Sequence, residues 1–487
     1  MKYILILISI SMFFGIFRIF SIDTYSVTLF DVGIVLFYLI TIKRIVWDGE
    51  VLLFPRSFGI YFVCAMIVAV ILSGIMPILE GNSNKQIQFL KTSAHFLYLV
   101  FFAILCAGVN IQLIDWKKTI QISMVCAIFI HIFGIYQLVA RGLDLPFAWL
   151  NISDITLSAT TRGLASATSL TDADGMTKQI SLNYGSFYRA TSIFSEPSTL
   201  ASFCNYILVC LLVPIIRNGK PFIQSKKFNI TLSILTVVSL FLTFSLTGLV
   251  LFLGIVGFAF LTDRSKNIIK ILKIICFVVV LLFITDFIVE ATTDISVASL
   301  FTQRVGGIVS KYIGGHIEST GGESFFTRMM SIVNALEIWV TYPITGIGVG
   351  CYYLFLRSPE FGFSDSGVFS VLAETGFIGI IIFLGIYVAL FNEWRRFLFT
   401  YYYRKLNEET KTMSLFVFYN LLLLSISSIT SNSFLNWTLW FYFGLTFTIL
   451  SIAYKECLLP VISIKVMNSP LKQLLAENFI QIKNSKP

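Results

Sequence analysis

Charged residues are scarce in this chain of 487 residues. Asp, Glu, Lys and Arg make up 13% of the sequence, whereas 56% is hydrophobic and 48 residues are phenylalanine. A water-soluble fold cannot bury so much apolar side chain, which excludes a soluble globular class and indicates a polytopic membrane protein. Alternating ten-residue segments of the barrel type are also missing, so the spans are expected to be helical. The predicted fold class is therefore all-α.

Ligands for bound groups are equally sparse. The chain has three histidines without a cluster, which argues against a haem or zinc site, and it has no P-loop for a nucleotide. No metal and no cofactor are therefore expected. Of eight cysteines, only Cys351 falls in a long outer loop, so no disulfide is expected there. The formal charge of +9 is attributed to basic cytoplasmic loops rather than to nucleic-acid binding.

Apolar windows of about 17–25 residues, the length that crosses the hydrocarbon layer, predict about twelve transmembrane helices. The first window follows Met1 and Lys2 without a small-residue cleavage site, so it is interpreted as an uncleaved span. The windows are 3–20, 27–43, 57–76, 89–108, 119–139, 197–216, 229–245, 248–262, 271–289, 367–391, 413–431 and 437–454.

The distribution of Lys and Arg predicts the orientation. With the N-terminus inside, the inner segments hold 24 of the 35 basic residues. This is the positive-inside bias of a membrane protein. Two outer segments are long, 140–189 and 290–366, and the second contains an amphipathic stretch at 325–342. We therefore expect one membrane domain over 1–487, with both termini inside and chemistry in the two long extracytoplasmic loops.

Arginine is the main basic residue of the outer loops. A guanidinium there suits fork-like binding of phosphate or carboxylate. Arg189 and Arg328 each precede an apolar segment and are the favoured anion-binding residues, whereas Arg141 and Arg162 are better explained as ordinary loop residues.

Two carboxylates stand where membrane helices are expected to begin. Glu196 precedes Pro197, and proline is tolerated in the first turn of a helix. Asp365 lies in the polar patch before the span at 367–391. Either carboxylate could orient or deprotonate a hydroxyl, or could be only a helix cap. The sequence leaves both interpretations open.

Three motifs together resemble the bacterial O-antigen polymerase and O-antigen ligase superfamily of polytopic membrane glycosyltransferases. The first is Arg189 followed by Phe-Ser-Glu-Pro at 194–197, and the second is Thr-Phe-Ser-Leu-Thr-Gly at 243–248. The third is an arginine, a Trp-bearing helix, Pro-x-x-Gly-x-Gly-x-Gly and Glu-x-Gly. Its residues are Arg328, Trp339, Pro343, Gly346, Gly348, Gly350, Glu374 and Gly376.

The chain departs from the family at one position. Nine residues before its Glu-x-Gly the family often has His-Asn, whereas this chain has Asp365 and Ser366. A carboxylate at the histidine position can also serve as a base poised at a hydroxyl. One copy of Arg-x10-Gly, from Arg304 to Gly315, is similar to a polymerase loop motif.

The resemblance implies a polymerase of surface polysaccharide repeat units (O-antigen, capsule or exopolysaccharide) in the bacterial cytoplasmic (inner) membrane, with its active site on the extracytoplasmic face. The donor would be an oligosaccharide on undecaprenyl pyrophosphate, and the acceptor a second lipid-linked unit. Arg189 and Arg328, with Arg304, would bind the pyrophosphate, and Asp365 or Glu196 would be catalytic. Its partners would be the lipid bilayer, a flippase and chain-length regulators, with no nucleic acid.

Two alternatives stay open. An O-antigen ligase, which moves the finished glycan onto lipid A core, differs only in its acceptor. A lipid-linked oligosaccharide flippase or other transporter would carry charged residues inside its spans and paired repeats. This chain instead has arginines in its outer loops, which favours the enzyme.

Overall fold

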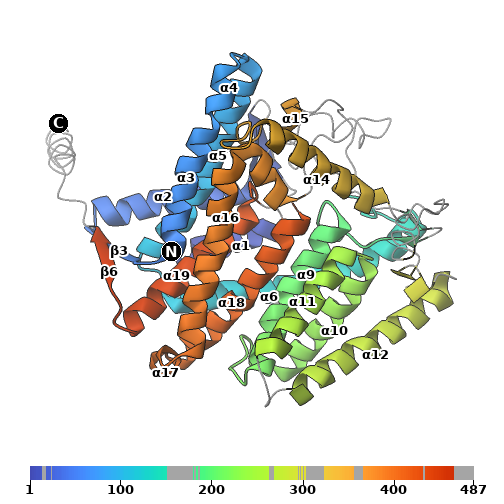
Figure 1. Ribbon diagram of the computed structural model, residues 1–487. Helices are drawn as coiled ribbons and strands as arrows, with labels where there is room; N and C mark the ends of the chain where they lie inside the picture. Colours follow the sequence, from blue (N-terminus) through green and yellow to red (C-terminus); the bar gives the residue numbers. More distant parts are fainter. Residues whose placement is uncertain are drawn as a thin grey trace, which may run out of the picture.

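The computed structural model is almost entirely helical (Figure 1). It describes residues 1–13, 18–22, 25–150, 179, 183–184, 187–262, 268–293, 296, 298–299, 301–302, 306, 323–355, 366–431 and 434–464. The helices are α1 (Lys2–Phe13), α2 (Leu29–Val46), α3 (Phe58–Ser73), α4 (Ile75–Leu79), α5 (Ser83–Gly108), α6 (Leu113–Gly142), α9 (Pro197–Ile216), α10 (Lys226–Leu242), α11 (Leu246–Thr262), α12 (Ile268–Thr293), α14 (Glu323–Thr341), α15 (Tyr352–Phe355), α16 (Gly367–Phe399), α17 (Tyr402–Lys405), α18 (Glu408–Thr430) and α19 (Trp437–Glu456).

Three short antiparallel strand pairs accompany the helices. They are β1 (Arg18–Ile22) with β2 (Tyr25–Thr28), β3 (Leu52–Pro55) with β6 (Val461–Ile464), and β4 (Asn183–Tyr184) with β5 (Phe187–Tyr188). The pair β3–β6 joins two segments from opposite ends of the chain, and the hydroxyl of Tyr454 donates to the carbonyl oxygen of Arg56 beside it (3.2 Å).

Eight helices within the described residues are long and apolar enough to cross a membrane. This confirms an all-α polytopic membrane protein. A helix occupies each of the twelve predicted windows, but the helix in the first window ends early. We expected one span over 3–20, whereas α1 ends at Phe13 and Arg18 begins the β1–β2 hairpin. At about 1.5 Å per residue, the twelve residues of α1 fall well short of the hydrocarbon thickness.

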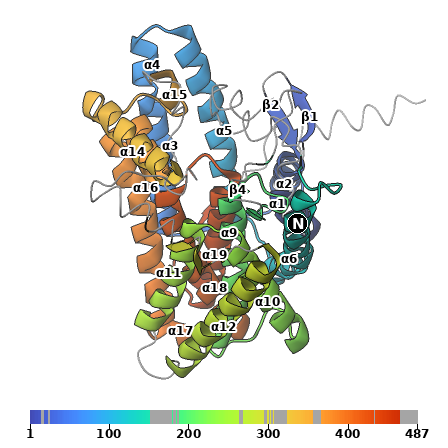
Figure 2. The same cartoon turned by 90° about the vertical axis from the view of Figure 1, so that its right-hand side faces the viewer.

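The two ends of the bundle differ. Figures 1 and 2 place α4, α14, α15 and the start of α16 at one end, and α17 at the opposite end. The backbone amide of Gly367, the first residue of α16, donates to the carbonyl oxygen of Ser431 just after α18 (2.9 Å), so these two helix ends meet. We call the end with α14 the loop end and the end with α17 the basic end, where Arg404 and Lys405 lie.

Helix pairing is dominated by segments far apart in the sequence. The most extensive helix pairs are α3 with α16 and α5 with α19. The carboxylate of Glu393 on α16 reinforces the first pair by accepting from the Ser57 hydroxyl (2.8 Å) and the Phe58 amide (2.6 Å). These groups stand at the start of α3, where backbone N–H groups have no partner within the helix.

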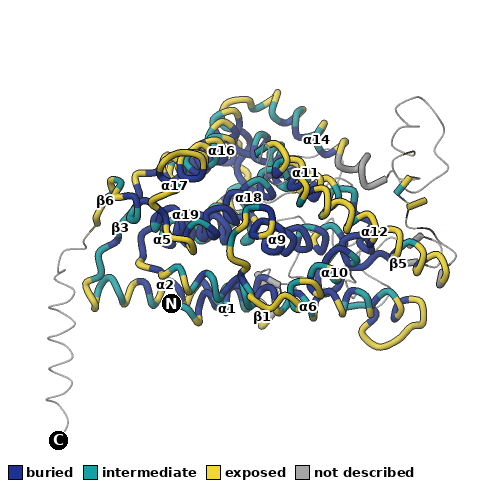
Figure 3. Tube along the Cα trace, turned by 90° about the horizontal axis from the view of Figure 1, so that it is seen from below, coloured by how far each residue is buried: buried dark blue, intermediate teal, exposed yellow. Residues whose placement is uncertain are grey.

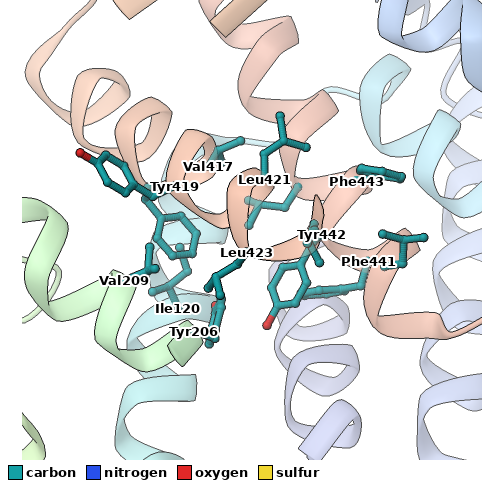
Figure 4. Close-up of a cluster of buried hydrophobic side chains, with 14 of the residues drawn as sticks. Ile120, Tyr206, Val209, Val417, Tyr419, Leu421, Leu423, Phe441, Tyr442 and Phe443 are labelled. Atoms are coloured by element: carbon teal, nitrogen blue, oxygen red, sulfur yellow. The ribbon is translucent and has the colours of Figure 1, made fainter. Parts of the chain in front are cut away.

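The core is aromatic and lies around α18 and α19. Figure 3 shows α9, α18 and α19 largely buried, whereas α12 exposes much of its length. Figure 4 shows Tyr206, Tyr419, Phe441 and Tyr442 among the aliphatic side chains of this cluster. A second, smaller cluster lies at the loop end and consists of Ala335, Ile338, Ile347, Tyr352 and Ala373.

Candidate functional site at the loop end

Two of the three sequence motifs touch directly. The segment 189–196, which we call the arginine loop, packs against the turn between α10 and α11. The Ala190 amide donates to the Leu242 carbonyl oxygen (2.9 Å), and Nε of Arg189 donates to the Thr243 carbonyl oxygen (2.8 Å). Arg189 is only 8% exposed. Arg189 therefore holds the two motifs together.

A second arginine fixes the backbone of the first. Arg141, near the end of α6, is 3% exposed, and its Nη1 donates to the Arg189 carbonyl oxygen (2.7 Å). Its Nε donates to the Ala148 carbonyl oxygen (2.9 Å), and its guanidinium stacks on the Trp149 ring at 4.2 Å. Because so many of its donors are engaged within the protein, Arg141 has a structural role. Arg141 was expected to be an ordinary loop residue, whereas it is buried in the last turn of α6.

Gln179 is a positioning residue that sequence reasoning missed. Its Nε2 donates to the carbonyl oxygens of Ser192 (2.6 Å) and Phe194 (2.7 Å). Its Oε1 accepts from Nη2 of Arg141 (3.0 Å). A single glutamine in a Ser/Thr-rich segment carries no periodic or motif signal. Its role follows only from the contacts that fix the arginine loop.

Glu196 stands at the N-cap of α9, with extended backbone (φ −147°, ψ 157°) and Pro197 as the first helical residue. Its carboxylate makes no cap hydrogen bond to a backbone N–H of the helix. It accepts instead from the Thr199 hydroxyl (3.3 Å). The cap explanation of Glu196 thus fits its backbone position but not its side chain, which lies half-buried at the positive end of a helix dipole.

The third motif locks a kink in α16. At Gly376 the helix is interrupted by a residue with φ 66° and ψ −162°. The glycine loop, which we define as 343–350, fills this interruption by backbone bonding. The Phe377 amide donates to the Pro343 carbonyl oxygen (2.8 Å), and the Gly348 amide donates to the Glu374 carbonyl oxygen (3.0 Å). Groups released by the kink are therefore satisfied by the loop.

The glycines of this motif are needed for close approach and for backbone conformation. Gly346 and Gly350 have φ of 67° and 78°, which side-chain-bearing residues rarely adopt. A Cβ on Gly346 would lie 2.4 Å from the carbonyl carbon of Glu374, and a Cβ on Gly350 would lie 2.1 Å from Oγ1 of Thr92. The glycines therefore allow the backbone of the glycine loop to pack directly against its neighbours, including the backbone of α16 at Glu374.

Glu374 lies under the glycine loop and is 4% exposed. The backbone amides of Gly350 and Tyr352 lie beside its carboxyl group. Its Oε2 has no hydrogen-bond partner among the residues that the structure describes. Burial of a carboxyl oxygen without a hydrogen-bond partner lowers the free energy of unfolding. Glu374 therefore destabilises the fold at this position.

A small ionic cluster borders the glycine loop. Nζ of Lys85 lies 2.5 Å from Oε2 of Glu80 and 3.4 Å from the centre of the Phe355 ring. The Tyr342 hydroxyl donates to Oε1 of Glu80 (3.4 Å), and burial, together with that carboxylate, raises the pKa of Tyr342. Burial raises the pKa of the Cys351 thiol to about 12. Glu80 thus offsets the positive charge of Lys85.

The structure places the predicted site residues unequally. Arg189 and Glu196 share the arginine loop, and Arg328 lies in the second turn of α14 at the same end of the molecule. The segment 325–342, expected to be amphipathic, coincides with α14 to within two residues. Arg304 and Asp365 lie outside the described residues. The N-cap of α16 is Ser366, so Asp365 precedes the cap position by one residue.

The helices are those of a multi-pass membrane protein, and α14 and the start of α16, which carry the third motif, lie at the loop end. Residues 231–384 match the family model described as O-Antigen ligase. This match confirms the resemblance to the O-antigen polymerase and ligase superfamily, which implies a membrane glycosyltransferase-like or ligase activity in polysaccharide biosynthesis. No curated protein matches the chain.

Proposed function

We propose that this chain polymerises repeat units of a surface polysaccharide. It would transfer a glycan from undecaprenyl pyrophosphate to a hydroxyl of a second lipid-linked unit. The observation that carries the proposal is the arrangement at the loop end: the Arg189 motif bonds to the α10–α11 turn, and the glycine loop locks the segment of α16 that follows Asp365 in sequence. The family match at 231–384 covers the contact between the glycine loop and α16.

The chemistry needs cations for a leaving pyrophosphate and an acceptor for the hydroxyl proton. Arg328 on α14 is the proposed pyrophosphate ligand, with Arg189 and Arg304 contributing charge. Because Nε of Arg189 bonds to the protein backbone, Arg189 is better suited to hold the site's shape than to release and rebind substrate at every turnover. Asp365 is the proposed base, and Glu196 is the second candidate.

The amphipathic helix α14 would lie in the membrane–water interface. Val340 on α14 is 71% exposed, and Ile344 and Phe377 beside it are also exposed. The Ile378 amide donates to the Ile344 carbonyl oxygen (3.4 Å), so the exposed Ile344 just after α14 lies against α16. A helix with such a face lies in the interfacial plane, and this would bring the headgroup of a lipid-linked substrate level with Arg328.

The test is a deletion of the gene in its host, followed by analysis of lipid-linked glycans. Loss of a polymerase leaves single repeat units on undecaprenyl pyrophosphate and no long chains. Loss of a ligase would instead leave long chains that remain lipid-linked, and this result would replace polymerase by ligase. The deletion is complemented by the wild-type chain and, as a matched control, by a variant with the exposed helix glycine Gly257 changed to Ala.

A flippase would also leave single units after deletion, but on the inner leaflet. Spheroplasts of the deletion strain are therefore treated with a glycosidase that cannot cross the membrane. Digestion of the accumulated units places them outside and supports the polymerase. Protection of the units would place them inside and support the flippase.

A further inference from the structure

Tyr352 connects α14 to the region around the kink in α16. Its hydroxyl donates to the backbone carbonyl oxygen of Ser331 on α14 at 2.9 Å, and both residues are buried. Ser331 follows Arg328 by three residues, which is close to one helical turn. The tyrosine hydroxyl therefore anchors the turn of α14 that begins at Arg328.

The backbone of Tyr352 is anchored in the opposite direction. Its amide, with that of Gly350, lies beside the carboxyl group of Glu374 on α16, and the Gly348 amide of the same loop donates to the Glu374 carbonyl oxygen (3.0 Å). The ring packs in the small cluster at the loop end beside Ala335 of α14 and Ala373 of α16. Tyr352 thus lies between the Glu374 region of α16 and the helix that carries Arg328.

Apolar packing alone would not require this arrangement. A phenylalanine at 352 and an uncharged side chain at 374 would fill the same volume without a buried carboxyl oxygen that lacks a described partner. The polar groups add a defined distance. A hydrogen bond of 2.9 Å fixes the position of the Ser331 carbonyl oxygen on α14 relative to the hydroxyl of Tyr352.

We propose that Glu374 and Tyr352 are positioning residues for Arg328, which set the distance between the arginine and the start of α16. This inference rests on the proposed role of Arg328 in binding pyrophosphate. Both residues are buried, so each would act through the placement of α14 rather than by contact with the substrate.

A double-mutant cycle tests the proposal with undecaprenyl pyrophosphate as the binding probe. Tyr352→Phe removes only the hydroxyl, and its loss should raise the Kd for the probe by about 3- to 10-fold, the equivalent of one hydrogen bond. In an Arg328→Ala background the same change should leave the Kd unaltered, because the residue being positioned is gone.

The matched control is Tyr454→Phe. The Tyr454 hydroxyl also donates to a backbone carbonyl oxygen, that of Arg56, but beside the β3–β6 pair far along the chain from α14. This variant should bind the probe like the wild type. Glu374→Gln keeps a carbonyl acceptor for the two amides and should retain most of the affinity, whereas Glu374→Ala should lose as much as Tyr352→Phe.

Each outcome separates the two hypotheses, provided that size-exclusion profiles show folded protein for every variant. Equal weakening by Tyr352→Phe with and without Arg328 would overturn the positioning role, as would unchanged binding in the single variant. Wild-type binding by Arg328→Ala would instead overturn the proposed role of Arg328 itself.

Discussion

Gly376 and Gly346 approach so closely that a Cβ on Gly376 would lie 2.7 Å from the backbone nitrogen of Gly346 and 2.3 Å from the carbonyl oxygen of Ile344. Both glycines have positive φ, 66° and 67°. The contact joins α16 to the first part of the glycine loop, directly after α14. It therefore connects the helix that carries Arg328 to the helix that follows Asp365. The joint has no room for any side chain.

Gly376→Ala should therefore be severely destabilising. The φ of 66° alone costs roughly 1–3 kcal/mol for a residue with a side chain, and the backbone contacts add to it. We expect a lower thermal midpoint in detergent and loss of polymer in cells. Gly257→Ala, in α11 with open space around the added Cβ, is the control and should match the wild type. An unchanged midpoint for Gly376→Ala would show that the joint is dispensable.

Asp365→Asn should abolish long chains while single lipid-linked units accumulate. Asparagine has a similar shape but cannot accept a proton. Because the N-cap of α16 is Ser366, the change leaves the cap residue in place, and protein levels should stay normal. Asp48→Asn, the same change at an exposed position between α2 and β3, is the control and should still polymerise. Wild-type chains from Asp365→Asn would move the proposed base to Glu196.

Arg328→Lys should fail nearly as badly as Arg328→Ala. An ammonium cannot supply two parallel bonds to a pyrophosphate, and each charge-assisted bond is worth about 1.5–3 kcal/mol. The expected loss in polymer formation is on the order of ten- to a hundredfold. Removal of a positive charge at the basic end, Arg404→Ala, serves as control. Normal polymer in Arg328→Ala cells at normal protein levels would contradict the assignment.

The Cys351 thiol should resist alkylation at neutral pH. Burial raises its pKa to about 12, nearby Glu374 and Glu80 act in the same direction, and Lys85 opposes them. Because the thiolate is the reactive form and its fraction falls tenfold per unit of pH below the pKa, maleimide labelling at pH 7–8 should be negligible. A chain whose single cysteine is Asn84→Cys should label readily, since Asn84 is an exposed polar residue at the start of α5. Rapid labelling of Cys351 at pH 7 would mean that the glycine loop opens.

Reporter fusions at Ser169 and Gly321 should both report an extracytoplasmic location. The expectation follows from the 24 of 35 basic residues in the inner segments. A fusion after Lys411 should report the cytoplasm and is the control. An inside signal at either loop would reverse the assignment of sides and with it the proposed site.

The sequence predicted where the apolar helices lie because apolar length is a direct requirement of the bilayer, but only eight of them, among the described residues, are long and apolar enough to span it. It underestimated α16, which was expected to end at residue 391 and continues to Phe399, because hydropathy records only the apolar part of a helix. It overestimated the first span, where a short hairpin follows Phe13. The apolar residues at 14–17 and 19–20 raised the hydropathy of this stretch and hid the end of the helix.

The candidate site was predictable only where glycine and proline restrict the backbone. Pro197 indicated the start of α9, and the glycine spacing indicated a special backbone at 343–350. Gln179 and Tyr352 could not be found in this way. Their roles depend on which carbonyl oxygen lies within reach, and this is set by tertiary packing rather than by neighbours in the sequence.

The pairing of α3 with α16 and of α5 with α19 has a consequence for biosynthesis. The early helices leave the ribosome long before their partners exist, and Gly59 on α3 must wait for Leu390, against which it packs. Until then, the surfaces of α3 and α5 that will contact α16 and α19 face lipid or the insertion machinery. Assembly of this protein is therefore completed only after translation of α19. In a nascent chain arrested after α12, α3 and α5 would lack their packing partners α16 and α19.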